Sequence, residues 1–465
     1  MKSQQTIQLL RDYESRNIVF VEPDGSWPIV WDRARNVHVW DADGKKYLDL
    51  TAAFGVAAAG HANPRVVKAG QKQMSRLLHA MGDVHPHARK AELARELSRI
   101  TFERWTKSPD PGRQTPDPVF GKTIFSNSGF EAVESAFKTA MLATGKRGVI
   151  AFEGAYHGLG YGALNATHRN FFRSPFHSQL REFGHFVPFP VAANVRRLTS
   201  NSKPETRNLK RNDEPPHVGC YEVERRIRQI FRRERIGAIL VEPVQGRGGI
   251  QVPPGEFLPL LRKLCDEHNA LLILDEIFTG FGRTGKWFAC EHTGVVPDLI
   301  CLGKALTGGF PLSACVGRAG LMDAAWPASR GEAIHTSTFL GHPVGCAMAL
   351  AQIQEIEKFE LPERSAELGK FLLGELQSKI SSPKLQIAMR GLGLMAGVEL
   401  RLLDGRPATD AAMLAIKAML QCGYILLPEG EHGNVISFTP PLTITRAQLA
   451  KAVAALQKVL TYEHG

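Results

Sequence analysis

The sequence predicts an α/β protein with a mostly parallel central sheet and a second, smaller α+β unit. From about residue 88, short apolar runs bounded by turn residues alternate with helical stretches, which is typical of a buried parallel sheet. After about residue 335 the pattern becomes helix-rich and then mixed. The 465 residues are enough for two or three compact units, and 43% hydrophobic with 22% charged residues argues against general disorder.

The elements before residue 150 follow from periodicity and turn residues. Residues 38–50 (HVWDADGKKYLDL) predict a hairpin, because alternating apolar residues flank a turn that ends in Asp-Gly. Residues 88–100 have the apolar spacing of a helix. Residues 123–126 predict a short strand, and residues 130–144 predict the helix that follows it.

The rest of the predicted sheet consists of compact apolar runs. These strands are residues 148–152, 237–243, 271–275, 298–302 and 312–317. Residues 257–268 predict a crossover helix, and residues 345–358 predict a helix of the second unit. The last helix begins at Thr445, where Gln448 three residues later gives the spacing of a capping box.

Composition narrows the class of protein. The chain has no run approaching the roughly 18 apolar residues of a membrane helix, and its first residues do not resemble a secretory signal. The seven cysteines are scattered, without CxxC or a Cys/His cluster, so we expect neither disulfides nor a metal site. Cys301 and Cys315 are expected to be buried, inert thiols. A cytoplasmic enzyme without membrane contact is the expectation.

The net charge of +11 raises the possibility of an acidic partner such as a nucleic acid. Much of the excess is local, in a polar basic insertion at residues 196–216 and the helix after it. That helix places Val223, Ile227, Ile230 and Phe231 on one face and its arginines on the other. A solvated basic face explains this pattern, no nucleic-acid-binding motif accompanies it, and we expect no nucleic-acid partner.

The segment GFGRTG at residues 280–285 satisfies a dinucleotide-binding pattern and nearly satisfies a phosphate-binding loop. Trp287 follows Lys286 where a phosphate-binding loop needs Ser or Thr, and the segment trails the acidic strand that such a loop should precede. No regular amphipathic helix follows the glycines, as a dinucleotide site requires. We therefore predict a glycine-rich turn near an active site, with neither an ATPase nor a dehydrogenase function.

Three other features of the sequence together indicate an active site. Ser128 and Glu131 have capping-box spacing where a strand passes into a helix, and such a helix terminus is suited to a phosphate, although most capped helices bind nothing. Asp275 closes an apolar strand at the edge where ligands of open α/β sheets bind. Lys304 follows another apolar strand, where burial would give a nucleophilic amine. A phosphate cradle, an acid and a buried lysine are what pyridoxal phosphate requires.

The chain closely resembles the class III aminotransferases, which are fold type I pyridoxal-phosphate enzymes. The longest matching segment is DEIFTGFGRTGKWFACEHTGVVPDLICLGKALTGGFPLSA at residues 275–314. Further matching segments occur in the same order along most of the chain, among them VWDADGKKYLDL, SNSGFEAVESAFK, FEGAYHG, VEPVQGRGG, TSTFLGHP, RGLGLMAGVEL and FTPPLTI. The resemblance implies a homodimer with active sites at the interface, a large domain at residues 76–334 and a small domain built from residues 1–75 and 335–465.

The resemblance also assigns roles to individual residues. Lys304 would form the Schiff base and carry the proton, and Asp275 would pair with the pyridine nitrogen. Ser128, Gly129 and Phe130 would form the phosphate cup. The other expected coenzyme contacts are Tyr156 and Ile277 on the two ring faces, Glu242 and His157 nearby, and Thr338, which would reach the coenzyme of the neighbouring subunit.

Three departures from the family pattern bear on the substrate. Arg247 replaces a common glutamate, and Ser437 replaces the arginine found in many members that use 2-oxoglutarate. In those relatives the two residues form a gate for carboxylates, so use of 2-oxoglutarate cannot be assumed here. Phe278 replaces a common glutamine, which removes an expected hydrogen bond to the coenzyme's ring hydroxyl.

Arg247 could itself bind a substrate anion, because guanidinium matches a carboxylate bidentately; pairing with a local acid is the other interpretation. Trp27 and Phe54 are candidates for an apolar substrate pocket; packing in the core is the other interpretation.

The predicted function is amino transfer from an amine or amino acid to a keto acid by a ping-pong route through a Schiff base at Lys304. A racemase, an epimerase or a decarboxylating relative is the alternative within the same fold, since all share the lysine and the aspartate. A basic interaction protein on an inactive scaffold is a third alternative.

Overall fold

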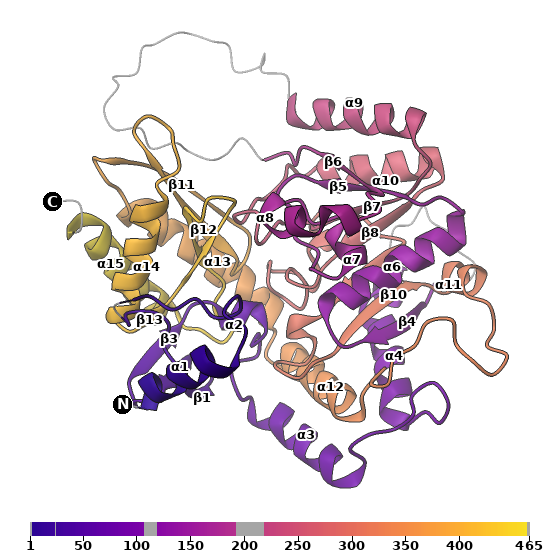
Figure 1. Ribbon diagram of the computed structural model, residues 1–465, viewed down its shortest axis with the longest axis horizontal. Helices are drawn as coiled ribbons and strands as arrows, with labels where there is room; N and C mark the ends of the chain where they lie inside the picture. Colours follow the sequence, from indigo (N-terminus) through magenta and orange to yellow (C-terminus); the bar gives the residue numbers. More distant parts are fainter. Residues whose placement is uncertain (1, 24, 107–118, 192–217, 463–465) are drawn as a thin grey trace.

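The computed structural model describes residues 2–23, 25–106, 119–191 and 218–462. Its centre is a seven-stranded sheet with the strand order β4-β10-β9-β8-β7-β5-β6 (Figure 1). The strands are β4 (Gly121–Ser126), β5 (Gly148–Phe152), β6 (Gly184–Val187), β7 (Ile236–Val241), β8 (Leu271–Asp275), β9 (Leu299–Leu302) and β10 (Ser313–Arg318). The predicted α/β class and mostly parallel sheet are confirmed.

The directions of the strands determine where the candidate site residues lie. β10 pairs antiparallel with both of its neighbours, β4 and β9, while the pairs from β9 to β6 are parallel. Two antiparallel steps restore the direction, so β4 ends at the same edge of the sheet as β8 and β9. The residues that end these three strands or follow them, among them Ser128, Asp275 and Lys304, therefore meet at one edge.

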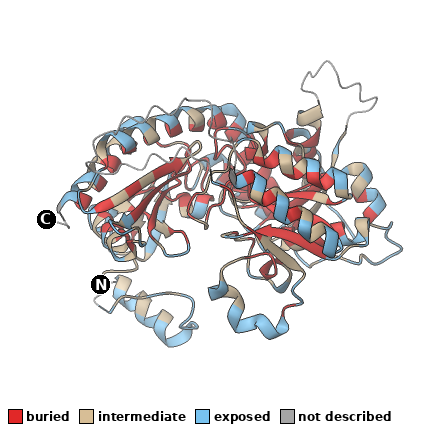
Figure 2. Cartoon of the chain, turned by 90° about the horizontal axis from the view of Figure 1, so that it is seen from above, coloured by how far each residue is buried: buried red, intermediate tan, exposed pale blue. Residues whose placement is uncertain are grey.

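Helices cover both faces of this sheet, which explains why its strands are continuously apolar. On one face α4 (Ala88–Ile100), α9 (Val218–Arg233) and α10 (Phe257–His268) contribute to the core. On the other face α6 (Gly129–Thr144) and α11 (Ala319–Ala325) pack against the sheet. Figure 2 shows the buried residues gathered in the layers between helices and sheet.

The shorter helical elements near this sheet are α5 (Phe102–Thr106), α7 (Tyr161–Leu164), α8 (Asn170–Arg173), η1 (Ser174–Gln179), η2 (Ala289–His292) and η3 (Lys304–Leu306). α12 (Pro343–Lys358) packs against α3 (Pro64–Arg76) and α4.

The two ends of the chain meet in a second body (Figure 1). Its first sheet has the order β1-β2-β3-β13, in which the C-terminal strand β13 pairs parallel with the N-terminal strand β3. Its second sheet has the order β11-β12-β15-β14. The strands are β1 (Trp31–Arg35), β2 (His38–Asp41), β3 (Lys46–Asp49), β11 (Leu385–Gly391), β12 (Ala396–Leu402), β13 (Tyr424–Ile425), β14 (Leu427–Glu429) and β15 (Val435–Phe438). The helices are α1 (Lys2–Tyr13), α2 (Ala52–Gly55), α13 (Leu361–Lys379), α14 (Thr409–Gln421) and α15 (Arg446–Tyr462).

Several local predictions are confirmed. The hairpin within residues 38–50 is β2 paired with β3, and the predicted strands and helices of the central sheet match within a few residues. The capping box of the last helix is formed, since Thr445 donates to Gln448 through both its amide and its hydroxyl, at 2.9 Å each. All seven cysteines are free thiols, and Cys301 and Cys315 are buried.

The structure describes only one of the two basic segments. The insertion at 196–216 lies outside the described residues. On α9 the predicted apolar face is confirmed, with Val223 and Ile227 buried. Three arginines of this helix, Arg225, Arg226 and Arg228, pair with acids. In the part of the chain that the structure describes, no helix combines the length and apolar character needed to cross a bilayer.

The glycine-rich segment at 280–285 is a turn that joins the two bodies. Arg283 is buried there and donates to the carbonyl oxygens of Leu394, at 3.0 Å, and Pro440, at 2.6 Å. Burial lowers the pKa of Arg283 to about 9. Because Gly393 packs directly on the backbone of Thr284, a Cβ at Gly393 would lie 2.4 Å from the Thr284 carbonyl carbon. The segment is therefore structural.

Candidate active site

A cavity of about 390 Å³ lies at the edge of the sheet where β4, β8 and β9 end. Most of the predicted site residues line it: Gly129, Phe130, Tyr156, His157, Glu242, Arg247, Asp275, Ile277 and Lys304. Phe278, predicted as a departure from the family pattern, lines it too. Residues from five separate stretches of sequence thus converge on one space.

Lys304 follows β9 and begins the short helix η3 with a backbone φ of +39°, a left-handed conformation that is uncommon for a residue with a side chain. Burial lowers the pKa of its amine, and the carboxylates of Asp275 and Glu242 partly oppose that shift. Its Nζ lies 4.6 Å from the centre of the Phe278 ring. An amine with a depressed pKa is a better nucleophile and base near neutral pH.

Asp275 is held by two partners at the end of β8. Its Oδ2 lies 2.7 Å from Nδ1 of His157, and its Oδ1 accepts the Ile277 amide at 3.1 Å. The other ring nitrogen of His157 is buried and has no hydrogen-bond partner among the described residues. His157 therefore supports the carboxylate of Asp275, in keeping with its predicted place beside the coenzyme.

The N-terminus of α6 supplies amides to the cavity, but not all three that were predicted. The amide and the hydroxyl of Ser128 both donate to Glu131, at 2.7 and 2.8 Å. The amides of Gly129 and Phe130 lie in the first turn, where no intrahelical acceptor exists. Gly129 lies close to Ile277, because a Cβ there would be 3.0 Å from Cδ1 of that side chain.

Glu242 and Tyr156 line the same cavity and are joined by a hydrogen bond. The carboxylate of Glu242 accepts the amides of Tyr156 and Gly246, each at 3.1 Å. Burial raises the pKa of Glu242. The Tyr156 ring packs edge-on against Phe172 at a centroid distance of 5.6 Å. Glu242 thus fixes the main chain on which Tyr156 is presented.

Phe278 is wedged between two glycines from distant parts of the chain. A Cβ at Gly55 would lie 2.4 Å from the Phe278 ring, and a Cβ at Gly246 would lie 2.3 Å from it. Gly55 also has φ +81°, and it ends a run in which Ala52, Ala53 and Phe54 all have positive φ. The sequence analysis identified the replacement at 278 but not this packing.

Arg247 pairs with an acid, which was one of its two interpretations. Its Nη1 lies 3.4 Å from Oε2 of Glu429, and its guanidinium carbon lies 5.8 Å from the centre of the Tyr156 ring. Ser437 is buried on β15, and its hydroxyl donates to the carbonyl of Leu427 at 3.2 Å. This chain therefore has an arginine–glutamate pair, but it is formed by Arg247 and Glu429 and not by residues at positions 247 and 437.

Three residues near this pair were missed. Glu429 is only 5% exposed although it is acidic, and it ends a short apolar stretch, Ile425–Pro428, which is the signal that could have identified it. Arg169 donates to the carbonyl of Glu431 at 2.6 Å and lies over the Phe172 ring at 5.7 Å. Nothing in the local sequence distinguishes Arg169 or Phe172.

Four predicted residues do not line the cavity. Ser128 lies just behind it, where its carbonyl accepts the hydroxyl of Ser313 at 2.6 Å. Trp27 packs against core clusters of the second body. Phe54 is 55% exposed, and Thr338 lies in an exposed loop.

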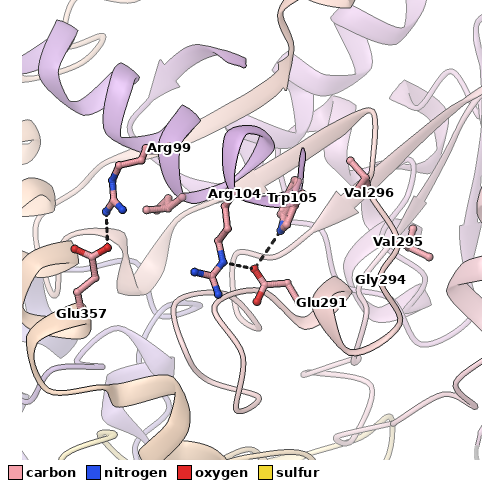
Figure 3. Close-up of a pocket in the computed structure, with 9 residues that line it drawn as sticks. Arg99, Arg104, Trp105, Glu291, Gly294, Val295, Val296 and Glu357 are labelled. Atoms are coloured by element: carbon pink, nitrogen blue, oxygen red, sulfur yellow. Dashed lines mark hydrogen bonds and ion pairs between the residues drawn. The ribbon is translucent and has the colours of Figure 1, made fainter. Parts of the chain in front are cut away.

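A larger cavity, of about 660 Å³, lies elsewhere, at the end of α4 and α5 (Figure 3). Its charged groups are already compensated: Arg104 and the Trp105 ring nitrogen both donate to Glu291 at 3.1 Å, and Arg99 pairs with Glu357. Since it holds no buried reactive group, we assign the chemistry to the cavity that contains Lys304.

The residues of that cavity fit pyridoxal phosphate. Helix α6 presents uncompensated amides for a phosphate, Asp275 keeps lone pairs for a ring nitrogen, and Lys304 offers an amine with a lowered pKa in the same space. The rest of the lining combines the charged side chains of Glu242 and Arg247 with the apolar side chains of Phe130, Ile277 and Phe278. The donor set and the cavity thus agree with the predicted coenzyme.

Comparison with known proteins agrees with this chemistry. Residues 20–460 match the profile of the family described as Aminotransferase class-III. The chain is 36% identical over 436 residues to 5-aminovalerate aminotransferase DavT of Pseudomonas aeruginosa, covering 92% of each sequence. It is also 36% identical over 431 residues to putrescine aminotransferase of Pectobacterium atrosepticum, covering 91% of this chain and 81% of that protein.

A solved structure gives the same result. The fold superposes with a TM-score of 0.82 on an amine transaminase from an uncultivated Pseudomonas species in its pyridoxal-phosphate-bound form, at 28% identity, over 97% of this chain and 99% of that chain. These proteins all carry names that denote amino transfer, so the aminotransferase prediction is confirmed, as is the coenzyme. The racemase and decarboxylase alternatives gain no support from them.

Proposed function

The chain belongs to the class III aminotransferases, and on this basis we propose how its own residues carry out amino transfer. The enzyme moves an amino group between an amine or amino acid and a keto acid with the help of pyridoxal phosphate. The observation that carries the proposed site is the cavity shared by Lys304, an amine with a lowered pKa, and Asp275, the acid that ends β8. When bound, the coenzyme supplies an electron-withdrawing ring that stabilises negative charge on the substrate's reacting carbon.

Several residues that line the cavity would bind the coenzyme, each at a different part of it. Gly129 and Phe130 would donate their amides to the phosphate, with Ser128 shaping the turn behind them. Asp275 would pair with the ring nitrogen, with His157 as its support. Tyr156 and Ile277 would cover the two ring faces, while Glu242 keeps Tyr156 in place.

Lys304 is the proposed proton carrier. Its Nζ would take the proton from the substrate carbon that bears the amino group and return it to the coenzyme carbon on the other side of that nitrogen, which is a 1,3-proton shift. Burial favours the neutral, proton-accepting form of this amine. The apolar ring of Phe278 beside Nζ keeps water away from the transfer.

We propose a homodimer whose interface includes an exposed apolar surface from two segments, 77–84 and 334–339. Its large side chains Leu78, Met81, Val84, Ile334 and Phe339 are each more than half exposed in the single chain. The segments are joined by a hydrogen bond of 2.6 Å from Thr336 to Asp83. A second copy would cover this surface, and Thr338, in the second segment, would reach the partner's phosphate.

The compartment is also proposed rather than established. All seven cysteines are free, and six of them are buried. A protein with unpaired thiols suits a reducing compartment. We therefore propose the cytoplasm.

The assignment of Lys304 is tested by borohydride reduction of the coenzyme-loaded enzyme followed by peptide mass spectrometry. The coenzyme mass is expected on the peptide that contains Lys304 and absent from that peptide in Lys304→Ala. Coenzyme attached to another lysine, or to none, would overturn the proposed site.

The substrate is proposed from Arg247. The two relatives of equal identity are named for different amines, so identity alone does not select one. 5-Aminovalerate and putrescine both carry a primary amine on a four-carbon chain and differ at the far end, a carboxylate in one and an ammonium in the other. We propose that Arg247 binds a carboxylate at the end of the substrate opposite the reacting amine. The enzyme would then accept amino acids such as 5-aminovalerate.

A comparison of 5-aminovalerate with putrescine tests the proposed role of Arg247. In the half-reaction, Arg247→Ala should weaken apparent binding of 5-aminovalerate by about 10- to 100-fold, the size of a lost charge-assisted hydrogen bond. Putrescine should change by less than about threefold. Equal losses for both amines would exclude Arg247 as an anion-binding residue.

A further inference from the structure

Arg247, which lines the cavity, pairs with Glu429 from a distant part of the chain. The main chains are also joined there, because the Gly430 amide donates to the Arg247 carbonyl at 3.1 Å. The Arg247 side chain is 34% exposed, whereas that of Glu429 is 5% exposed. Arg247 is therefore the member of the pair with room to move, and Glu429 is fixed by its surroundings.

The environment of Glu429 is unusual for a carboxylate. The basic groups of Arg247, Lys304 and Arg169 lower the pKa of Glu429, and the carboxyl group of Glu242 raises it. Its Oε2 is buried without a hydrogen-bond partner among the described residues, and its distance of 3.4 Å to Arg247 makes the ion pair a loose one. Burial raises the pKa of Glu429 to about 7, and the charge of Arg247 restrains that rise.

A substrate carboxylate would compete with Glu429 for Arg247. Guanidinium binds a carboxylate best through two parallel hydrogen bonds, which the loose pair with Glu429 does not provide. When Arg247 turns toward the substrate, Glu429 is left buried beside Glu242 without its main partner. A buried carboxylate in that position is far more stable with a proton than without one.

Resting on the proposed function, we propose that a substrate carboxylate displaces Glu429 from Arg247 and that Glu429 takes up one proton from solvent as it is displaced. The charges balance, since the substrate brings one negative charge and the proton one positive charge. A substrate without a far carboxylate leaves the pair intact and takes up no proton. Proton uptake at Glu429 thereby distinguishes the two classes of substrate.

The sign of the pH effect follows from this exchange. Below about pH 7 Glu429 already holds its proton, so binding of a carboxylate does not depend on pH. Above about pH 7 each bound carboxylate must bring a proton with it. The dissociation constant then rises by up to about tenfold for each unit of pH.

The test uses glutarate, a dicarboxylate without an amine, as an unreactive probe of the coenzyme-loaded enzyme. Calorimetric titration at pH 8 in two buffers of different ionisation enthalpy counts the protons taken up. About one proton per glutarate is expected, and the dissociation constant should rise between pH 7 and pH 9. Binding without proton uptake, a constant affinity, or no binding of glutarate would each overturn the proposal.

Two variants identify the group. Glu429→Gln should bind glutarate about tenfold more tightly than the wild type at pH 8, without proton uptake, because no carboxylate has to be neutralised. The matched control is Glu431→Gln, which removes the same charge from an exposed position two residues away and should behave as the wild type. Proton uptake that persists in Glu429→Gln, or is lost in Glu431→Gln, contradicts the assignment.

This test is separable from that of the proposed function. The absorbance of bound coenzyme and its reaction with an amine that lacks a carboxylate report on Lys304 and Asp275 in every variant. If both are retained while glutarate binding shows no proton uptake, only the exchange at Glu429 fails. If both are absent from the wild type, the proposed function itself fails.

Discussion

The Nζ atom of Lys304 lies 4.6 Å from the centre of the Phe278 ring, so the amine that is to react rests against an aromatic face. The ring cannot easily move away, because Gly55 and Gly246 hold it from both sides. An aromatic face stabilises an ammonium group relative to a neutral amine. Phe278 therefore opposes the effect of burial on Lys304 while excluding water.

Replacing Phe278 by leucine should lower the pKa of Lys304 in the coenzyme-free enzyme. The lost interaction is worth about 0.5–1 kcal/mol, which corresponds to a fall of about half a pH unit. The rate at which pyridoxal phosphate attaches to the enzyme rises as the amine loses its proton, so its pH profile should move to lower pH. Phe278→Tyr keeps the ring and should leave the profile in place; an upward shift in Phe278→Leu would contradict the interpretation.

Gly55→Ala should destabilise the protein more than Gly44→Ala. Both glycines have positive φ, +81° and +90°, so both substitutions strain the backbone by about 1 kcal/mol. Only Gly55 has the Phe278 ring in the way, since a Cβ at Gly44 would meet no atom within 4 Å. The clash should add about 1–3 kcal/mol to the loss in free energy of unfolding, measured by urea denaturation.

The same comparison has an internal control. Adding Phe278→Leu to Gly55→Ala should recover part of the additional loss, because the smaller side chain can give way. Equal destabilisation by the two glycine substitutions would show that the ring is free to move.

Asp275→Asn should slow amino transfer by about two to three orders of magnitude, comparable to removing one preorganised electrostatic partner of a reacting group. His157→Gln should have a smaller effect, because it loosens the carboxylate of Asp275 but leaves its charge. Single-turnover absorbance changes of the bound coenzyme measure both. Equal rates for Asp275→Asn and wild type would remove Asp275 from the proposed mechanism.

Arg283→Met should lower the free energy of unfolding by at least about 3 kcal/mol. The substitution leaves the carbonyls of Leu394 and Pro440 buried without their donor, at the contact between the two bodies. The exposed Arg406, paired with Asp404, is the matched control, and Arg406→Met should change stability by less than about 0.5 kcal/mol. Similar losses in urea denaturation would contradict the structural role of Arg283.

Much of the fold was predictable because the signals are local. The strands at 148–152 and 271–275 and the helices at 88–100 and 257–268 have the predicted bounds, since apolar runs and helical periodicity are properties of short stretches. The direction of β10 was not specified, because an apolar run reads the same in a parallel and an antiparallel strand.

The candidate site was predictable where its residues follow strands, and not where they meet across the chain. Asp275 and Lys304 could be placed together because both follow parallel strands of one sheet. The pairing of Arg247 with Glu429, and the contact of Gly55 with Phe278, depend on tertiary packing between stretches far apart in sequence. The capping-box spacing of Ser128 and Glu131 was visible in the sequence, and a capping box engages the amide of its first residue, so the donation of the Ser128 amide to Glu131 follows from that spacing.

The pairing of β3 with β13 has a consequence for synthesis of the chain. The hairpin of β2 and β3 leaves the ribosome long before the neighbour of β3 on that side, Tyr424–Ile425, has been translated. Until then the nascent hairpin presents an open edge, which is a surface prone to wrong pairing. A chaperone that shields nascent chains would have to cover the edge of β3 until residues 424–425 emerge. A premature stop codon before residue 424 would leave that edge permanently unpaired.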